Sequence, residues 1–321
     1  MIHWDAHTCL PQHPDASFEP VARLHAAGVH YTSLNVGADM NPLSQVMSVI
    51  AGYRATIAAQ PERYVLAATV ADVKRAAMEG RMALTFDLEG SMPLLDRPDM
   101  VALYAQLGVR QIHFAYNRNN SVAGGCHDEP RGLTALGRRM VQAVNDAGII
   151  MDCAHTGLLS SLEIMEVSSK PVVFSHANPY ALTAHGRNVT DEQIRACAAT
   201  GGVVCVSGLS WFLGGTAPSA ADVARHAAYL ADVAGVQHVG IGTDICFSQP
   251  ELDDTPPGGF DPSYWWPASA GYSRDNPPTF VAPEMWRELA AELRQVGMSD
   301  AETAQVMGGN MLRVATETWP T

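Results

Sequence analysis

Five short apolar runs in this chain end, within two residues, at side chains that bind metal ions well. They are residues 2–4 before Asp5 and His7, 83–88 before Glu89, 149–154 before His155, 172–175 before His176, and 239–243 before Asp244. In a βα barrel the carboxyl ends of all parallel strands meet at one rim, where the active site is built. Five such endings, spread over the whole chain, therefore predict ligands that converge at one rim and favour a metal-dependent hydrolase.

Strand and helix patterns alternate from one end of the chain to the other. Apolar, β-rich runs predict strands over residues 2–4, 30–35, 83–88, 111–114, 149–153, 172–174, 203–206 and 239–241. Amphipathic stretches between them cover residues 43–59, 134–147, 190–199 and 219–234. This alternation is typical of βα units around a parallel sheet. We therefore expect an α/β fold, a (β/α)8 TIM barrel of the metallo-dependent hydrolase type.

The expected helices carry recognisable start signals. Thr190 and Ser219 stand where an N-cap is needed, because their hydroxyls can accept a backbone N–H of the first turn. Two further helices are expected at the C-terminus, over residues 283–296 and 299–317. The second opens with a capping box from Ser299 to Glu302.

The 321 residues, 47% of them hydrophobic, can bury one large core, so a single domain over 1–321 is expected. Residues 247–283 depart from the regular pattern and are rich in Pro and Gly. They carry the aromatic residues Phe260, Tyr264, Trp265, Trp266 and Tyr272. Placed after the eighth strand, this aromatic loop would lie over the barrel mouth. Two interpretations remain open: a wall of the substrate pocket, or a packing or oligomer surface.

The net charge and the number of cysteines limit which binding partners and which cellular location are expected. Lys and Arg number 20 against 33 Asp and Glu, a net charge of -13 that disfavours nucleic acid and anionic membrane surfaces. The six cysteines contain no C-x-x-C pair and indicate no disulfide framework. The first residues carry neither a signal-peptide pattern nor a membrane-spanning run. A cytoplasmic location and a small polar substrate are therefore expected.

The strand-end residues suit metal chemistry. Glu89 follows a continuous apolar run, so its carboxylate must be paired or metal-bound to offset its desolvation. A two-metal barrel needs an anionic bridge, and neither lysine suits as a carbamylated one, because Lys74 lies in a helical stretch and Lys170 precedes a strand. Glu89 is then the natural bridge. His155 and His176, after consecutive strands, can meet on one Zn²⁺ with it.

Asp244 ends the eighth strand and has two possible roles, metal ligand or general acid/base. A water activated by a metal needs a carboxylate within hydrogen-bond reach to take its proton and return it to a leaving amine.

Seven stretches of the chain together resemble the membrane dipeptidase family (renal dipeptidase, peptidase family M19). They are DAHTCLP from Asp5, FDLEG from Phe86, GLTALGRRMV from Gly132, MDCAHTG from Met151, FSHANPYALTAHGRNVTD from Phe174, GIGTD from Gly240 and GGNMLRV from Gly308. They span nearly the whole chain in the family's order. The resemblance implies a bacterial-type soluble enzyme with two Zn²⁺ ions on an amidohydrolase-type barrel, which hydrolyses dipeptides by a metal-activated hydroxide. Such enzymes often dimerise, which leaves room for a homodimer.

The resemblance also implies a role for each matching residue. The first metal would be bound by His7 and the second by His155 and His176, with Glu89 bridging the two; Asp244 would act on the hydroxide and the leaving nitrogen, and Arg187 would contact the substrate. A guanidinium fork suits the carboxylate of a dipeptide.

Two positions depart from the family pattern. Cys9 stands where the family has an aspartate two residues after the first metal-binding histidine. It is either a thiolate ligand or a neutral thiol beside a weakened first site. Tyr116 stands where some members have a histidine that polarises the scissile carbonyl, and a phenol can still donate a hydrogen bond to an oxyanion.

These departures keep two other functions open. One is a related amidohydrolase that acts on N-acyl amino acids or lactams with one metal. The other is a catalytically weakened barrel that binds a small molecule, although Glu89, His155, His176 and Asp244 are all present together. We expect His113, together with His3, His127 and His185, to be structural or solvated.

Overall fold

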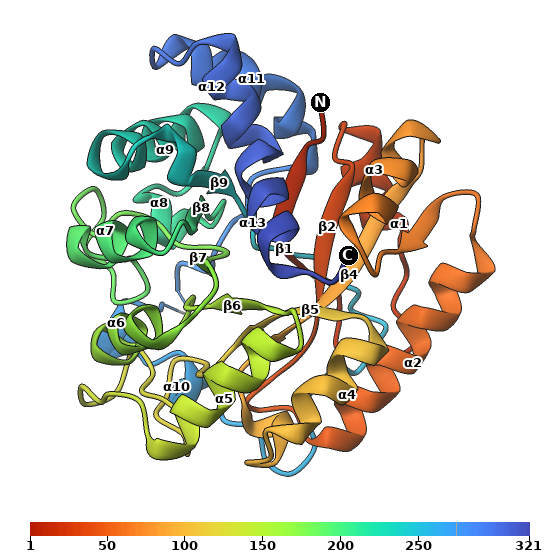
Figure 1. Ribbon diagram of the computed structural model, residues 1–321, viewed down its shortest axis with the longest axis vertical. Helices are drawn as coiled ribbons and strands as arrows, with labels where there is room; N and C mark the ends of the chain where they lie inside the picture. Colours follow the sequence, from red (N-terminus) through yellow and green to blue (C-terminus); the bar gives the residue numbers. More distant parts are fainter. Residues whose placement is uncertain (274) are drawn as a thin grey trace.

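The computed structural model describes residues 1–273 and 275–321, and its parallel strands form a ring (Figure 1). The strands in ring order are β1 (Trp4–Cys9), β2 (Tyr31–Ala38), β4 (Met82–Glu89), β5 (Val109–His113), β6 (Ile150–Asp152), β7 (Val172–Phe174), β8 (Val203–Val206) and β9 (Val239–Ile241), followed by β10 (Ile245–Cys246). A short strand, β3 (Tyr64–Leu66), pairs with the start of β4 outside this order. The expected α/β barrel is confirmed.

The last strand closes the ring through a three-residue break. β9 pairs with β8, and β10, after residues 242–244, pairs with β1. Asp5 fastens this junction: its Oδ1 accepts the backbone N–H of Thr243 at 2.7 Å and its Oδ2 accepts the Thr243 hydroxyl at 2.6 Å. The closure places β1 beside the chain that carries Asp244.

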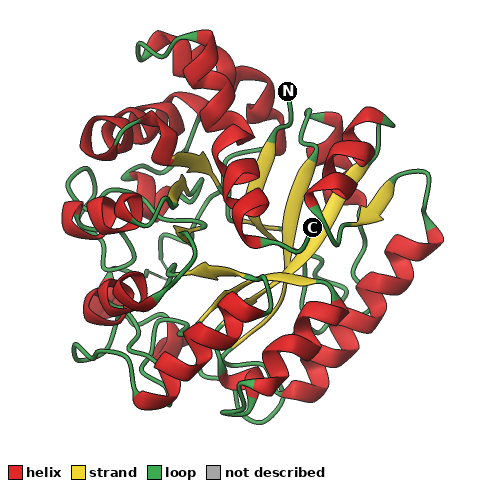
Figure 2. Cartoon of the chain, viewed as in Figure 1, coloured by secondary structure: helices red, strands yellow, loops and turns green. Residues whose placement is uncertain are grey.

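Helices surround the strands, as Figure 2 shows. The longer ones are α1 (Glu19–Ala26), α2 (Leu43–Ala59), α3 (Val70–Met78), α4 (Asp99–Leu107), α5 (Ala135–Asp146), α6 (Leu158–Val167), α7 (Asp191–Ala199), α9 (Ala220–Ala234), α11 (Trp286–Gln295) and α13 (Asn310–Thr318); α8 (Ser210–Leu213), α10 (Pro262–Trp265) and α12 (Asp300–Ala304) are short. Thr190 and Ser219 are N-caps of α7 and α9, each in a capping box, as expected.

Helix α13 covers one end of the barrel and lies over the strands in Figure 1. Trp319, which follows it, packs against Trp4 at 5.6 Å and Tyr31 at 5.9 Å between ring centroids. Trp4 and Tyr31 begin their strands, so this end is the amino-terminal one. It is filled by side chains, and the opposite end is left for a site.

Two expected elements differ most clearly from the structure. The first strand, expected over residues 2–4, runs from Trp4 to Cys9, so Asp5, His7 and Cys9 lie inside it. The expected helix over 299–317 keeps its capping box at Ser299 but is broken before α13. Gly308 has a non-helical backbone there and packs so closely on Ile2 that a Cβ would meet its carbonyl oxygen.

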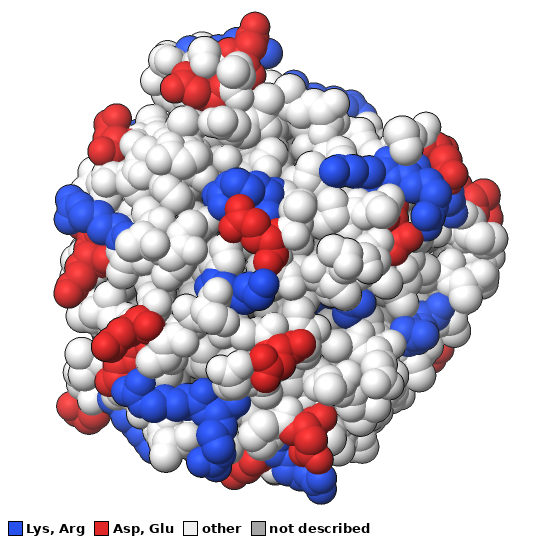
Figure 3. Space-filling model, in the orientation of Figure 1, with Lys and Arg blue, Asp and Glu red and all other residues white. Residues whose placement is uncertain are grey.

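Within the described residues, we find no helix that combines the length and the apolar character needed to cross a bilayer. On the face drawn in Figure 3, acidic and basic side chains lie interspersed. The basic side chains on this face therefore have acidic side chains beside them.

Candidate functional site

Glu89, the last residue of β4, lies at the centre of a cluster of histidines. Its Oε1 is 3.1 Å from His155 Nε2, 3.3 Å from His176 Nε2 and 3.5 Å from His7 Nε2. His113 Nδ1 lies 4.0 Å from the same oxygen. The structure thus brings together, at the carboxyl ends of four strands, the residues that the sequence predicted as ligands, and adds His113.

Each of these histidines has a polar side chain close to its second ring nitrogen. His7 Nδ1 lies 3.2 Å from Asp87 Oδ1, and His113 Nε2 lies 2.7 Å from Asp152 Oδ2. On the other two rings this nitrogen is Nδ1: that of His155 lies 2.8 Å from Asn117 Oδ1, and that of His176 lies 2.8 Å from Ser175 Oγ. Such partners fix ring orientation and leave one nitrogen free to bind a metal ion.

Two site residues have a left-handed backbone. His155, with φ of 63°, follows β6, and Asp244, with φ of 57°, lies between β9 and β10. Non-glycine residues in this region cost energy and concentrate at functional sites, where surrounding structure enforces them. The left-handed turn that follows each strand therefore directs these side chains back into the barrel mouth.

Cys9, Asp244 and Cys246 lie together beside His7. Cys9 Sγ is 3.4 Å from His7 Nε2, and Asp244 Oδ1 is 3.8 Å from the same nitrogen. Cys9 and Cys246 are register partners on β1 and β10. A hydrogen bond with Cys246, together with burial, raises the pKa of Cys9 well above its usual value, so binding a cation there would release a proton.

The pKa values of the histidines in the cluster shift in opposite directions. Burial raises the pKa of Glu89 to about 7. Burial alone would lower the pKa of His7, but the carboxylates of Asp87 and Glu89 outweigh it and raise that pKa well above its usual value. Burial and neighbouring positive groups lower the pKa values of His155 and His176 well below normal. Both rings are therefore neutral, as metal ligation requires.

These residues fit a metal ion. His176 Nε2 is buried, has no hydrogen-bond partner among the described residues, and faces Glu89 Oε1. Imidazole nitrogen, carboxylate oxygen and cysteine sulfur are all ligands of Zn²⁺. Candidate groups of such atoms within 4.8 Å of one another are His7–Cys9–Glu89, His7–His176–Asp244, Cys9–Asp244–Cys246 and Glu89–His113–His155. A cation here would compensate the buried carboxylates.

Arg187 and Tyr116 flank the cluster. Arg187 is buried, its Nη2 donates to the His176 carbonyl at 3.3 Å, and its guanidinium lies over the Phe212 ring at 5.3 Å. With His155, it lines a cavity of about 170 Å³. The Tyr116 ring stacks on His155 with centroids 4.2 Å apart. Both side chains therefore border the space next to the predicted ligands.

The aromatic loop of residues 247–283, apart from residue 274, which lies outside the described residues, contacts this flank. Trp266 Nε1 donates to the Tyr116 hydroxyl at 3.1 Å, and Asn117 Nδ2 donates to the Trp265 carbonyl at 3.0 Å. The Tyr272 hydroxyl lies 2.9 Å from His127 Nε2. The loop thus borders the mouth of the barrel, on the side of Tyr116.

Two members of the cluster, His113 and Cys246, were not among the ligands predicted from the sequence. His113 was expected to be structural, although it ends β5 in the same way as Glu89 ends β4. The strand was expected to extend to residue 114, which placed His113 inside the strand and not at its end. Cys246 reaches the site through the pairing of β10 with β1, which no local sequence pattern indicates.

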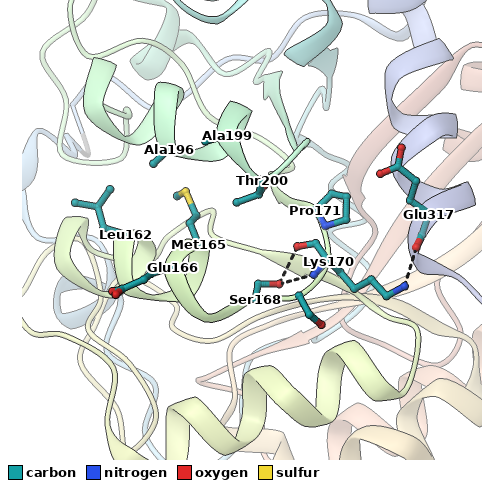
Figure 4. Close-up of a pocket in the computed structure, with 11 residues that line it drawn as sticks. Leu162, Met165, Glu166, Ser168, Lys170, Pro171, Ala196, Ala199, Thr200 and Glu317 are labelled. Atoms are coloured by element: carbon teal, nitrogen blue, oxygen red, sulfur yellow. Dashed lines mark hydrogen bonds between the residues drawn. The ribbon is translucent and has the colours of Figure 1, made fainter.

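A larger cavity, of about 580 Å³, lies elsewhere (Figure 4). It is bounded by α6, by the residues before β7 and β8, and by Glu317 of α13, so it belongs to the amino-terminal end of the barrel. Lys170 lines it and donates from Nζ to the Glu317 carbonyl at 3.1 Å. Lys170 is therefore far from the histidine cluster in the fold, which agrees with its exclusion as a metal bridge.

Comparison with known proteins identifies relatives along most of the chain. Residues 15–255 match the family model described as Membrane dipeptidase (Peptidase family M19). The chain is 30% identical over 262 residues to Dipeptidase aclJ of Aspergillus oryzae, covering 79% of this chain and 56% of that protein. It is 27% identical over 320 residues to Dipeptidase verJ of Clonostachys rogersoniana, covering 98% and 71%. The chain thus spans little more than half the length of the first of these relatives.

Among solved structures, an amidohydrolase from Pseudomonas aeruginosa is similar over 99% of this chain and 96% of its own, with a TM-score of 0.85 and 25% identity. The likeness covers the whole barrel, including the strands that carry the histidine cluster.

Proposed function

The chain belongs to the membrane dipeptidase family, peptidase family M19, and we propose that it is a zinc-dependent dipeptidase with two metal ions around Glu89. In this proposal His7 and Cys9 would hold the first ion, His155 and His176 would hold the second, and Glu89 would serve both. The observation that carries it is the convergence of three imidazole nitrogens within 3.5 Å of one Glu89 oxygen.

When bound, the metal ions supply Lewis acidity that polarises a peptide carbonyl and makes water a better nucleophile. The protein holds the ligands for this task. Asp87 and Asn117 orient the rings of His7 and His155 through their Nδ1 atoms, so that the Nε2 atoms face Glu89. Because the site is buried, bulk water is limited and the charges there interact strongly.

Asp244 is proposed as the group that moves the proton. Its Oδ2 accepts a hydrogen bond from the Ser207 hydroxyl at 3.3 Å, which leaves Oδ1 directed at the His7 side of the cluster. Burial raises the pKa of this carboxyl, which makes it a better proton acceptor than an exposed aspartate. Asp244 would take a proton from the attacking water and deliver it to the amine that leaves.

Arg187 is proposed to bind the carboxylate at the C-terminus of the dipeptide. Its Nε has no hydrogen-bond partner among the described residues, so the guanidinium retains donor capacity. Phe212 on one side and the His176 carbonyl on the other hold it in place. A fixed guanidinium selects a free carboxylate over an amide. Tyr116, whose ring stacks on His155, is proposed to hydrogen-bond the reacting carbonyl.

The test is turnover of a substrate panel by purified protein loaded with Zn²⁺. Dipeptides, N-acyl amino acids and lactams are compared, and bound metal is counted by mass spectrometry. We expect hydrolysis of dipeptides with about two metal ions per chain. Hydrolysis of acyl amino acids or lactams alone, with one metal ion, would replace the proposal by the related amidohydrolase. Tight binding without any turnover would indicate a binding protein.

The cytoplasmic location and the homodimer stay predictions, as does the single domain over 1–321. Size-exclusion chromatography with light scattering tests the dimer directly.

A further inference from the structure

Two cysteines from opposite ends of the sequence meet at the seam where the barrel closes. Cys9 ends β1, Cys246 ends β10, and the two are register partners in the parallel pairing of these strands. The Cys246 thiol donates to the Asp244 carbonyl at 3.8 Å, and Cys9 Sγ lies 3.4 Å from His7 Nε2. Cys9 is half-buried and Cys246 is exposed. Cys246 therefore lies on the solvent side of the pair, and Cys9 lies on the side of the barrel interior.

Nitrogen and oxygen donors complete the surroundings of this pair. One ligand atom each of Cys9, Asp244 and Cys246 lie within 4.8 Å of one another, and so do those of His7, Cys9 and Glu89. Cys9 therefore belongs to both groups, whereas Cys246 is this close to Cys9 and Asp244 and reaches the His7 group only through Cys9.

The separations among Cys9, His7 and Glu89 match those of ligands around one tetrahedral zinc ion. With Zn–S near 2.3 Å and Zn–N near 2.0 Å, tetrahedral angles place sulfur and nitrogen ligands about 3.5 Å apart. Cys9 Sγ and His7 Nε2 are 3.4 Å apart, and His7 Nε2 and Glu89 Oε1 are 3.5 Å apart. These donor atoms are already spaced for a shared ion.

We propose that Cys9 and Cys246 together bind the metal ion of the His7 half of the site as a pair of thiolates. This inference rests on the proposed function in that it assigns ligands to the first metal, and it adds a ligand, Cys246, to that site. A thiolate carries the same formal charge as a carboxylate but is a softer donor. The site is therefore selective for thiophilic ions such as Zn²⁺, Cd²⁺ and Co²⁺ over Mg²⁺ and Mn²⁺.

Cobalt substitution tests this directly, because thiolate ligation of Co²⁺ produces a sulfur-to-metal charge-transfer band in the near ultraviolet. The full chain is reduced, freed of metal and titrated with Co²⁺. We expect the band in the natural sequence, a weaker band in Cys9→Ser and in Cys246→Ser, and its loss in the double variant. Cys205→Ala, which removes a buried thiol in β8 outside the cluster, should leave the band unchanged.

Carboxylate variants test whether a weaker band in the serine variants is caused by misfolding. Cys9→Asp and Cys246→Asp supply an oxygen ligand in place of sulfur, so each should still bind cobalt while the charge-transfer band weakens. Zinc should also protect two thiols of the natural protein from a thiol reagent, and one fewer in either single variant.

Several results would overturn the inference. The first is the absence of the charge-transfer band in the reduced, cobalt-loaded protein. The second is a band of unchanged intensity in Cys246→Ser. The third is equal affinity of the protein for Mg²⁺ and Zn²⁺. The outcome is separable from the dipeptidase proposal. Dipeptide turnover without a sulfur band overturns the thiolate pair alone, whereas a full band without turnover of any dipeptide supports the pair and overturns the proposed function.

Discussion

The Nδ1 atom of His7 lies 3.2 Å from Oδ1 of Asp87, and both side chains are completely buried. The carboxylate lies beside Nδ1, while Nε2 lies 3.5 Å from Glu89 Oε1. Asn35 in turn donates from Nδ2 to Asp87 Oδ1 at 3.1 Å. The orientation of the first predicted ligand therefore depends on a group that would not touch the metal.

Asp87→Asn should weaken binding of the first metal ion by about 10- to 100-fold, the usual effect of removing such an orienting carboxylate. Competition with a zinc chelator measures the affinity. Asp128→Asn, which alters an ion pair with Arg118 outside the histidine cluster, is the matched control. Unchanged affinity in Asp87→Asn would show that His7 is oriented by packing alone.

Asp244→Asn should lower kcat for dipeptides by about 10²- to 10⁴-fold, because an amide cannot accept and return the proton. KM and the number of bound metal ions should stay close to those of the natural sequence. Steady-state kinetics and metal counting are measured on the same preparation. Loss of metal in step with activity would make Asp244 a ligand instead of a proton carrier.

Arg187→Lys should reduce kcat/KM for dipeptides by about 10- to 100-fold, since an ammonium replaces the guanidinium fork and loses a charged hydrogen bond. The same dipeptides with an amidated C-terminus lack the carboxylate, so their turnover should change much less. Arg138→Lys, in an exposed pair with Glu163, is the control. Equal losses for both substrate forms would contradict carboxylate binding by Arg187.

His226, fully buried in α9, should make the protein sensitive to acid. Burial, with the neighbouring Arg225 charge, lowers its pKa to about 4, whereas the unfolded chain keeps a value near 6.5. Between these values the unfolded state binds a proton that the native state does not, so stability falls as pH drops from 6.5 toward 4. The loss amounts to about 3 kcal/mol.

His226→Leu removes this titration. Urea unfolding at pH 7 and at pH 4.5 should show a smaller acid-induced loss of unfolding free energy in the variant, by about 2 to 3 kcal/mol. Subtracting the two proteins cancels the contribution of every other titrating group. Parallel losses in both would place the acid sensitivity elsewhere.

Trp319→Ala should destabilise the fold by about 3–5 kcal/mol, because it empties the space between α13 and the strand starts at Trp4 and Tyr31. Trp319→Phe, which keeps an aromatic ring there, should cost much less. Thermal unfolding of both variants measures the difference. Since this end of the barrel is opposite the histidine cluster, metal binding to the folded variant should be unchanged.

The local patterns of the sequence predicted most of the framework. The strand around Glu89 and the helix start at Thr190 were correct because an apolar run and an N-cap act over a few neighbouring residues. The bounds of β1 were wrong for the same reason. In the sequence, the polar residues Asp5 and His7 appear to end the apolar run. In the closed barrel they belong to the strand, because its interior can hold polar side chains.

By itself, the sequence determined that strands would alternate with helices and that Glu89, His155 and His176 would stand at strand ends. The tertiary structure decided how these groups meet. It turned His113 toward Glu89, and it closed the ring so that Cys246 lies beside Cys9. The physical reason is that register and ring orientation depend on contacts between segments far apart in the chain, which no local pattern records.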